Sequence, residues 1–395
     1  MLGRLKFEIS DLVNQVLDQL PKEVWSSSVT TFLDPSMGGG QFVRAIESRL
    51  RKYGHSDSNI ANRVFGYESN VMRVRFAVNK YKLIGTYVAK DLVKEPTNMQ
   101  FDVVIGNPPY TDGTAGKSNI WQKFVTSKVA ESSDYCCWVL PSSFMQTNQN
   151  PMPDVRKFLK AQGMKSIKIL GLNAFESASV RTIYVYCEKG YTGKTKVTDK
   201  TESYEIEFDG NPVVFGGSET GTRLIQRIQT NEKYRLKKTK DTPLAKKVSS
   251  YSQLSGDVQF LENLSSSNIN GKIGYVNTNE KLDYSDCDKI RLVLGYLPSG
   301  TNFAKSFGTM NIIMPGVIVP SYYRYFTCET VEEANLLKNY LESKLVTFIQ
   351  QHARTSQTLD NPQIHFVPVI NNLTQDHYSY FNLTTDEIDY IEANS

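Results

Sequence analysis

Four consecutive residues, Asn107, Pro108, Pro109 and Tyr110, have the clearest chemistry in the sequence. They follow the apolar run 101–106, which has the pattern of a strand. Two prolines in a row lack backbone N–H donors and fix the direction of the chain. The amide oxygen of Asn107 and the carbonyl of Pro108 can then converge on one planar amino group and leave its nitrogen nucleophilic. The ring of Tyr110 would stack on the group that carries this nitrogen. We therefore assign catalysis to these four residues.

A second loop combines an acid with three consecutive glycines between a strand-like run and a helical pattern. Glycine lets the backbone turn tightly and approach a ligand, and the start of a helix presents free N–H groups. No Gly-Lys-Ser/Thr sequence closes the loop, so it is not a phosphate-binding P-loop. The loop reads Asp34-Pro35-Ser36-Met37-Gly38-Gly39-Gly40-Gln41-Phe42.

Two further carboxylates end strand-like runs. Glu68 is placed to accept hydrogen bonds from ribose hydroxyls, as an acid at the end of the second strand does in nucleotide-binding sheets. Asp91 ends the third run, where it could accept a hydrogen bond from an adenine amino group. The alternative for Glu68 is a solvated surface residue, and the alternative for Asp91 is a helix-capping or turn residue.

These loops need elements that hold them at one edge. Strand-like and helical patterns alternate through residues 1–190, which predicts an α/β domain with a parallel, doubly wound sheet. Ligands of such sheets lie beyond the carboxyl ends of the strands. The predicted strands are 29–33, 63–66, 87–89, 101–105, 135–140, 167–170 and 182–187, and the predicted helices are 9–20, 41–51, 71–83, 120–130 and 155–161.

Residues 191–395 lose this rhythm. Their connections are rich in Gly, Asn, Ser and Thr, as in 263–271, and their β-type runs are short, as in 312–320. One long helical pattern covers 331–351. We predict a second, α+β domain here.

Composition limits the class of protein. The chain has 395 residues, of which 40% are hydrophobic and 22% charged, as in an average globular protein of two domains. No apolar run approaches the ~18–20 residues of a membrane span, and the first residues lack the apolar core of a secretory signal, so we expect no membrane contact. The five cysteines contain no CxxC pair and the four histidines do not cluster. We therefore expect no metal site and a reducing, cytoplasmic location.

The charge is unevenly distributed. The net charge is 45 − 41 = +4, but residues 221–248 hold nine Lys or Arg and two acids, which gives 9 − 2 = +7. Such a stretch can follow a phosphate backbone. A solvated linker or helix face is the alternative.

In this order, the four loops resemble the gamma class of adenine-N6 DNA methyltransferases, of the NPPY type and Eco57I-like. The resemblance rests on four motifs: Asp-Pro-x-x-Gly-Gly-Gly-x-Phe, Gly-Tyr-Glu, the strand-end Asp, and Asn-Pro-Pro-Tyr. Similar segments are found at 9–13, 138–144, 175–182, 366–368 and 383–392. The class usually has Gly-Ser-Gly or Gly-x-Gly where this chain has three glycines. The resemblance is strongest over 29–190.

The resemblance implies a class I S-adenosylmethionine-dependent methyltransferase domain, Rossmann-like, at 1–190, and a target-recognition domain that binds double-stranded DNA at 191–395. The implied reaction methylates the amino group of an adenine that is flipped out of the duplex. The implied cofactor-binding residues are Asp34, Pro35, Gly38, Gly39, Gly40, Phe42, Glu68, Ser69, Asp91, Leu92 and Asn107. Tyr110 and Phe175 would form the pocket for the target base. DNA contacts are expected at Lys117, Arg235, Lys237, Lys238, Arg354 and Gln357.

Other functions stay open at this point. Asn-Pro-Pro-Tyr also occurs in methyltransferases that act on rRNA bases or on a glutamine of translation release factors, but these usually have no large C-terminal domain. A domain that only binds is disfavoured because every motif residue is present. We find no nuclease motif, so a cognate endonuclease would be a separate partner. We expect a monomer on an asymmetric site, in a restriction-modification, orphan or phage protective role.

Overall fold

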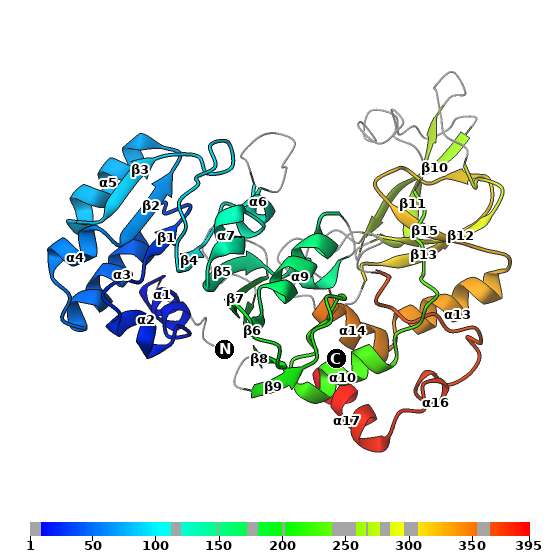
Figure 1. Ribbon diagram of the computed structural model, residues 1–395. Coiled ribbons are helices and arrows are strands. Elements are labelled where there is room, and N and C mark those ends of the chain that lie inside the picture. Colours follow the sequence, from blue (N-terminus) through cyan, green and yellow to red (C-terminus); the bar gives the residue numbers. More distant parts are fainter. Residues whose placement is uncertain are drawn as a thin grey trace. The chain divides into compact units, whose positions relative to one another are not determined.

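The computed structural model describes residues 9–111, 120–147, 150–171, 181–199, 202–238, 258–265, 268–276, 285–295, 307–353 and 364–395. The chain forms two compact units, Met1–Pro212 and Val213–Ser395 (Figure 1). The sequence places the boundary at residue 190, whereas the structure places it after Pro212. The reason is that two further strands, β8 (Thr195–Asp199) and β9 (Glu202–Ile206), join the sheet of the first unit.

The first unit is built on a sheet whose described strands follow the order β3-β2-β1-β4-β5-β7-β6-β8-β9. Strands β1 to β5 are parallel, and β7 is antiparallel to both β5 and β6. The sheet is therefore mixed, and the prediction of a parallel sheet was wrong at this edge. Parallel strands need a crossover of a dozen or more residues, and only 172–181 separate β6 from β7. The other strands are β1 (Phe32–Asp34), β2 (Val64–Glu68), β3 (Thr86–Ala89), β4 (Val103–Gly106), β5 (Tyr135–Pro141), β6 (Met164–Gly171) and β7 (Thr182–Glu188).

The strand order confirms the predicted fold class. From β1 the chain builds outward through β2 and β3, then returns to the other side of β1 with β4 and β5. This is a doubly wound, Rossmann-like sheet, with the reversed β7 between β5 and β6.

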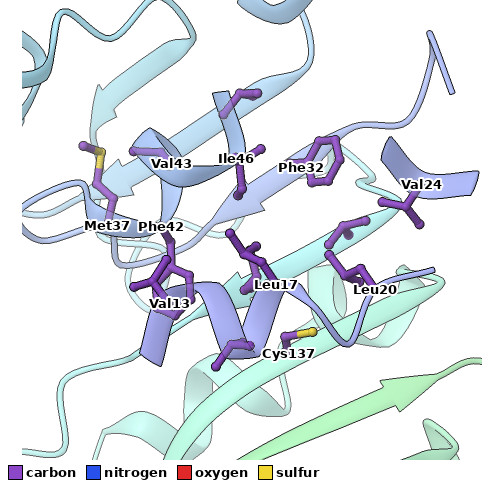
Figure 2. Packing of buried hydrophobic residues seen from close by; sticks show 14 of the residues in the cluster. Val13, Leu17, Leu20, Val24, Phe32, Met37, Phe42, Val43, Ile46 and Cys137 are labelled. Atoms are coloured by element: carbon purple, nitrogen blue, oxygen red, sulfur yellow. The ribbon is translucent and has the colours of Figure 1, made fainter. Parts of the chain in front are cut away.

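Amphipathic helices cover the sheet and bury its central strands. Figure 2 shows Val13 and Leu17 of α1 facing Phe42 and Ile46 of α3, in one core cluster with sheet residues such as Phe32. The predicted helix 120–130 is two short helices. The Ser127 side chain accepts a hydrogen bond from the N–H of Ala130 and caps the start of the second helix. The helices of this unit are α1 (Ile9–Leu17), α2 (Lys22–Ser26), α3 (Gln41–Lys52), α4 (Asp57–Ala61), α5 (Val71–Tyr81), α6 (Trp121–Val125), α7 (Lys128–Ser132), α8 (Ser143–Gln146) and α9 (Met152–Ala161).

The second unit is α+β in its described parts, with two three-stranded sheets. The predicted single helix 331–351 is two helices, α13 and α14, because the Ser343 hydroxyl accepts from the N–H of Val346 and restarts the helix. The strands are β10 (Val258–Ser265), β11 (Asn268–Val276), β12 (Ile290–Leu294), β13 (Met310–Ile313), β14 (Val317–Ile318) and β15 (Arg324–Cys328). The helices are α10 (Glu219–Arg227), α13 (Val331–Leu341), α14 (Lys344–Ala353), α16 (His377–Tyr380) and α17 (Thr385–Asn394).

Within the described parts of the chain, none of the helices combines the length and apolarity needed to cross a bilayer.

Candidate active site

The adjacent carboxyl ends of β1 and β4, called here the β1–β4 edge, bring two of the predicted site loops together. The strand order reverses here, and ligands of doubly wound sheets bind at such a reversal. Asp34 is the last residue of β1, and Gly106 is the last residue of β4. A Cβ atom at Gly106 would lie 2.9 Å from Asp34 Oδ1, so the close approach depends on glycine. Asp34 therefore lies against the backbone that leads into Asn107.

The glycine loop between β1 and α3 has the conformation that its sequence predicts. Gly38 and Gly40 have φ angles of 49° and 81°, in the left-handed region that favours glycine. The N–H of Met37 donates to the carbonyl of Tyr67 at 2.8 Å, which ties the loop to β2. Gly40 is the N-cap of α3, and no described side chain caps the N–H groups of the first turn. These donors are available to a ligand with acceptor atoms.

Asp34 is a buried acid with little compensation for its charge. It is 2% exposed, and its Oδ1 accepts from the N–H of Ser36 at 3.0 Å. Burial raises the pKa of Asp34 to about 7; the Ser36 N–H opposes this shift and the nearby charge of Glu68 adds to it. A carboxyl in this position favours a cationic ligand, because a positive charge would stabilise its ionised form.

Glu68 is also buried, at 8% exposure, so the alternative of a solvated surface residue does not hold. Its Oε1 accepts from the Ser69 hydroxyl at 3.3 Å and from the N–H of Asn70 at 3.0 Å. Asn70 in turn caps α5. The carboxylate is thus fixed at the end of β2, where the resemblance places a ribose contact.

Asp91 has the contacts of a turn residue. Its Oδ1 accepts from the N–H groups of Val93 and Lys94 at 3.1 and 3.4 Å, and its Oδ2 lies 3.4 Å from Lys94 Nζ. This is the alternative that the sequence left open. A contact between Asp91 and the adenine of a cofactor stays a prediction.

The remaining residues predicted to bind the cofactor divide into two groups. The side chain of Pro35 lies beside Gly106 at the β1–β4 edge, because a Cβ atom at Gly106 would lie 3.4 Å from Pro35 Cδ. The side chains of Phe42 and Leu92 are buried, and Phe42 lies in the core against α1 (Figure 2). Packing therefore accounts for Phe42.

The Asn-Pro-Pro-Tyr segment presents a buried acceptor. Asn107 Oδ1 is buried, and no described group donates a hydrogen bond to it. Pro108 is buried, Pro109 is exposed and Tyr110 is half-buried. Burial raises the pKa of the Tyr110 hydroxyl, and the Thr182 side chain opposes this shift. A buried acceptor without a hydrogen-bond donor lowers the stability of the folded state by about 1–3 kcal/mol. A ligand that donates a hydrogen bond to Asn107 Oδ1 would remove this cost.

Further buried side-chain atoms of the first unit lack a described partner, among them Ser36 Oγ, Gln122 Nε2 and Ser142 Oγ. Gln122 is in the first turn of α6, the next described helix after the Asn-Pro-Pro-Tyr segment, and Ser142 follows β5. The rings of Trp121 and Phe144 are 5.9 Å apart and hold α6 against α8. Sequence reasoning gave Gln122 no role, because a glutamine in a helical pattern carries no signal that it is buried.

Three of the predicted DNA contacts, Lys117, Arg354 and Gln357, lie outside the described residues, and so does Phe175, which was predicted to border the target base. Arg235, Lys237 and Lys238 are exposed residues of the second unit. Lys237 already has contacts within the protein, because its backbone pairs with Tyr325 and its Nζ lies 3.3 Å from Asp286. Arg235 and Lys238 are the better candidates for phosphate contacts.

Residues 44–175 match the family model of the Eco57I restriction-modification methylase. The chain is also 30% identical over 125 residues to an uncharacterized adenine-specific methylase of Mycoplasma pneumoniae, which covers 28% of this chain and 29% of that protein. Solved structures with a similar fold include the Type IIL restriction-modification enzyme MmeI in complex with DNA, with a TM-score of 0.46 at 12% identity over 89% of this chain and 64% of that one. They also include the type IIG restriction endonuclease BpuSI, with a TM-score of 0.44 at 12% identity over 97% of this chain and 59% of that one. The chain thus spans less than a third of the length of the curated relative it matches.

Proposed function

We propose that this chain, whose residues 44–175 match the Eco57I restriction-modification methylase family, is a site-specific DNA adenine-N6 methyltransferase that uses S-adenosylmethionine. The observation that carries the proposal is the buried acceptor Asn107 Oδ1, which has no described donor and follows the glycine that packs on Asp34. An adenine amino group would satisfy this acceptor.

The residues that follow β1 and β2 fit S-adenosylmethionine. The glycines of the loop and the uncapped N–H groups of α3 offer donors to its carboxylate, and Asp34 offers a negative charge to its cationic groups. Glu68 is fixed at the end of β2 to accept from ribose hydroxyls. When bound, the cofactor supplies an electrophilic methyl group.

The chain's own residues prepare the amino group. Asn107 Oδ1 and the carbonyl of Pro108 accept its two hydrogens, which keeps the nitrogen lone pair out of conjugation with the ring. Flipping the base out of the duplex costs a few kcal/mol, and stacking on Tyr110 recovers ~1–3 kcal/mol. Holding both reactants in a fixed geometry supplies much of the rate.

Adenine in DNA is the substrate that the relatives favour, because the curated relative is described as adenine-specific and the family as restriction-modification methylases. The second unit would supply target recognition, with Arg235 and Lys238 on phosphates. We expect a monomer in the cytoplasm, with any cognate endonuclease as a separate protein.

Transfer of labelled methyl groups to unmethylated bacterial DNA tests the proposal. We expect methylated adenines in one short sequence motif, detected by single-molecule sequencing. Asn107→Ala should lower the transfer rate by about 10²-fold or more while cofactor affinity, measured by calorimetry, stays close to that of the wild type. Asn107→Asp is the matched control, because it keeps an acceptor oxygen and should retain more activity than Asn107→Ala.

Two results would contradict the proposal. Full activity of Asn107→Ala would exclude the assigned mechanism. Labelling of rRNA or of a release-factor glutamine in place of DNA would show that the same acceptors serve another planar amino group.

A further inference from the structure

One face of α3 lines a groove of about 990 Å³ in the first unit. The helix residues that line it are spaced along a single stripe, opposite the face that packs on the sheet. The other walls come from α1, α2 and the end of α5. The residues of the stripe are Gln41, Arg44, Ala45, Ser48, Arg49 and Lys52.

The groove is strongly basic. Its lining holds five cations, Lys22, Arg44, Arg49, Lys52 and Lys80, against one carboxylate, Asp18. Asp18 is already paired with Arg49 at 2.7 Å, and the other four cations form no ion pair with a described residue. The excess of 5 − 1 = +4 equals the net charge of the whole chain. Like charges gathered in a concave surface raise the local potential and favour an anionic ligand.

Aromatic rings hold several of these cations in place. The guanidinium of Arg44 is 4.7 Å from the centre of the Tyr81 ring, and Lys80 Nζ is 5.1 Å from the same ring. The guanidinium of Arg49 is 5.3 Å from the Trp25 ring. Side chains that are ordered before binding lose less entropy when a ligand arrives.

The cations and their spacing favour an acidic helix as the ligand. Arg49 is recessed, with a side-chain exposure of 19%, so a ligand must enter the groove to reach it. Stacking of single-stranded bases is disfavoured, because Trp25 is 3% exposed and the Tyr81 ring already carries two cations. The helix positions of Arg44, Ser48 and Lys52 repeat every ~6 Å along the groove. An acidic helix with carboxylates four residues apart has the same repeat.

We propose that the α3 groove is a docking site for an acidic helical segment of a separate protein, whose carboxylates pair with Arg44, Lys52, Lys80 and Lys22. Charge complementarity and the spacing along α3 select this partner. The inference goes beyond methyl transfer and does not depend on it.

The test uses the full chain and labelled probes in fluorescence anisotropy. The probes are a helical peptide with glutamate at every fourth position, its glutamine counterpart, an oligothymidylate and a DNA duplex. The groove variant carries Lys22→Gln, Arg44→Gln, Lys52→Gln and Lys80→Gln. A control variant removes the same charge from exposed positions of the first unit outside the groove, by Arg75→Gln, Lys128→Gln, Lys157→Gln and Lys196→Gln.

We expect the wild type to bind the glutamate peptide more tightly than its glutamine counterpart. The groove variant should bind it about tenfold more weakly, while the control variant, duplex binding and methyl transfer stay within about twofold of the wild type. Equal weakening of peptide binding in both variants would overturn the proposal. The proposal would also be overturned if the groove variant bound the glutamate peptide as tightly as the wild type does. A groove variant with weakened binding of the duplex or of oligothymidylate, and unchanged binding of the peptide, would overturn it as well. Methyl transfer is measured in the same samples, so a failure of the docking proposal can be told apart from a failure of the proposed methyltransferase function.

Discussion

The ionisation of Asp34 should be visible in the stability of the cofactor-free protein. Burial raises its pKa from the ordinary 3.8 to about 7. The native state therefore binds a proton at pH values where the unfolded chain has already lost it. Because the folded state then holds more protons than the unfolded state, this carboxyl makes the free energy of unfolding fall as the pH rises from about 4 to about 7.

The size of the effect follows from the difference between the two pKa values. At 1.36 kcal/mol per pKa unit, the contribution of Asp34 is about 4 kcal/mol, which is an order-of-magnitude figure. The group is fully buried, so solvent does not screen it. Asp34→Asn keeps the shape of the side chain and removes the charge. The variant should therefore gain stability relative to the wild type as the pH rises, and the gain should level off above about pH 7.

Urea unfolding of both proteins from about pH 5 to about pH 8 measures this difference directly, and subtraction cancels the titration of every other group. Calorimetry adds a second readout, because a cationic ligand beside Asp34 should bind with release of a proton below about pH 7, and Asp34→Asn should abolish the release. A stability difference between the two proteins that does not change with pH would refute the reasoning.

Two further predictions concern the packing around the site. Gly106→Ala places a Cβ atom 2.9 Å from Asp34 Oδ1. The variant should lose about 1–3 kcal/mol in the free energy of unfolding and should bind the cofactor more weakly. If urea unfolding and calorimetry gave the wild-type values, the close approach would not be required. Glu47→Ala should lower the free energy of unfolding by about 3 kcal/mol, because the N–H donors at Ile84 and Gly85 lose their buried acceptor. Ser48→Ala, an exposed neighbour on the same helix, is the control and should change stability by less than about 0.5 kcal/mol, so equal losses would contradict this role of Glu47.

The strand-end loops were predictable because each combines a local signal with a place in an alternating pattern. Glycines at 38 and 40 have the left-handed conformation that only glycine adopts easily, and the preceding apolar run fixes the end of β1 at Asp34. The same logic placed Glu68 and Asn107 at the ends of β2 and β4. Local sequence is sufficient here because strand, turn and helix start within a few residues of one another.

Features that depend on long-range contacts were not predictable. The boundary at residue 190 missed β8, whose place is set by pairing with β6, and β9, which pairs with β8. The pattern over 331–351 stays apolar on one face across the break at Ser343, so periodicity alone gives one helix. Gln122 gives no sign of burial in the sequence, because its burial depends on neighbours that are distant in the chain.

Two buried carboxylates in the first unit, Glu47 and Asp34, differ in how many hydrogen bonds they accept. Glu47 is 1% exposed, and it accepts from the N–H groups of Ile84 and Gly85, from the Tyr87 hydroxyl and from Arg51. Asp34 is as deeply buried, but Ser36 is its one donor among the described residues.

A buried charge is tolerated when its hydrogen bonds are complete, as at Glu47, whereas an incomplete set lowers stability unless another group binds there. Asp34 and the partnerless oxygen of Asn107 are such incomplete sites, and both lie where β1 and β4 end. The fold thus holds a destabilised acid and a destabilised acceptor at the ends of adjacent strands, and ligands that bring a cation and an amino group would relieve both. Since natural folds keep such strain mainly where function requires it, the two residues support the proposal that the reaction takes place at the β1–β4 edge.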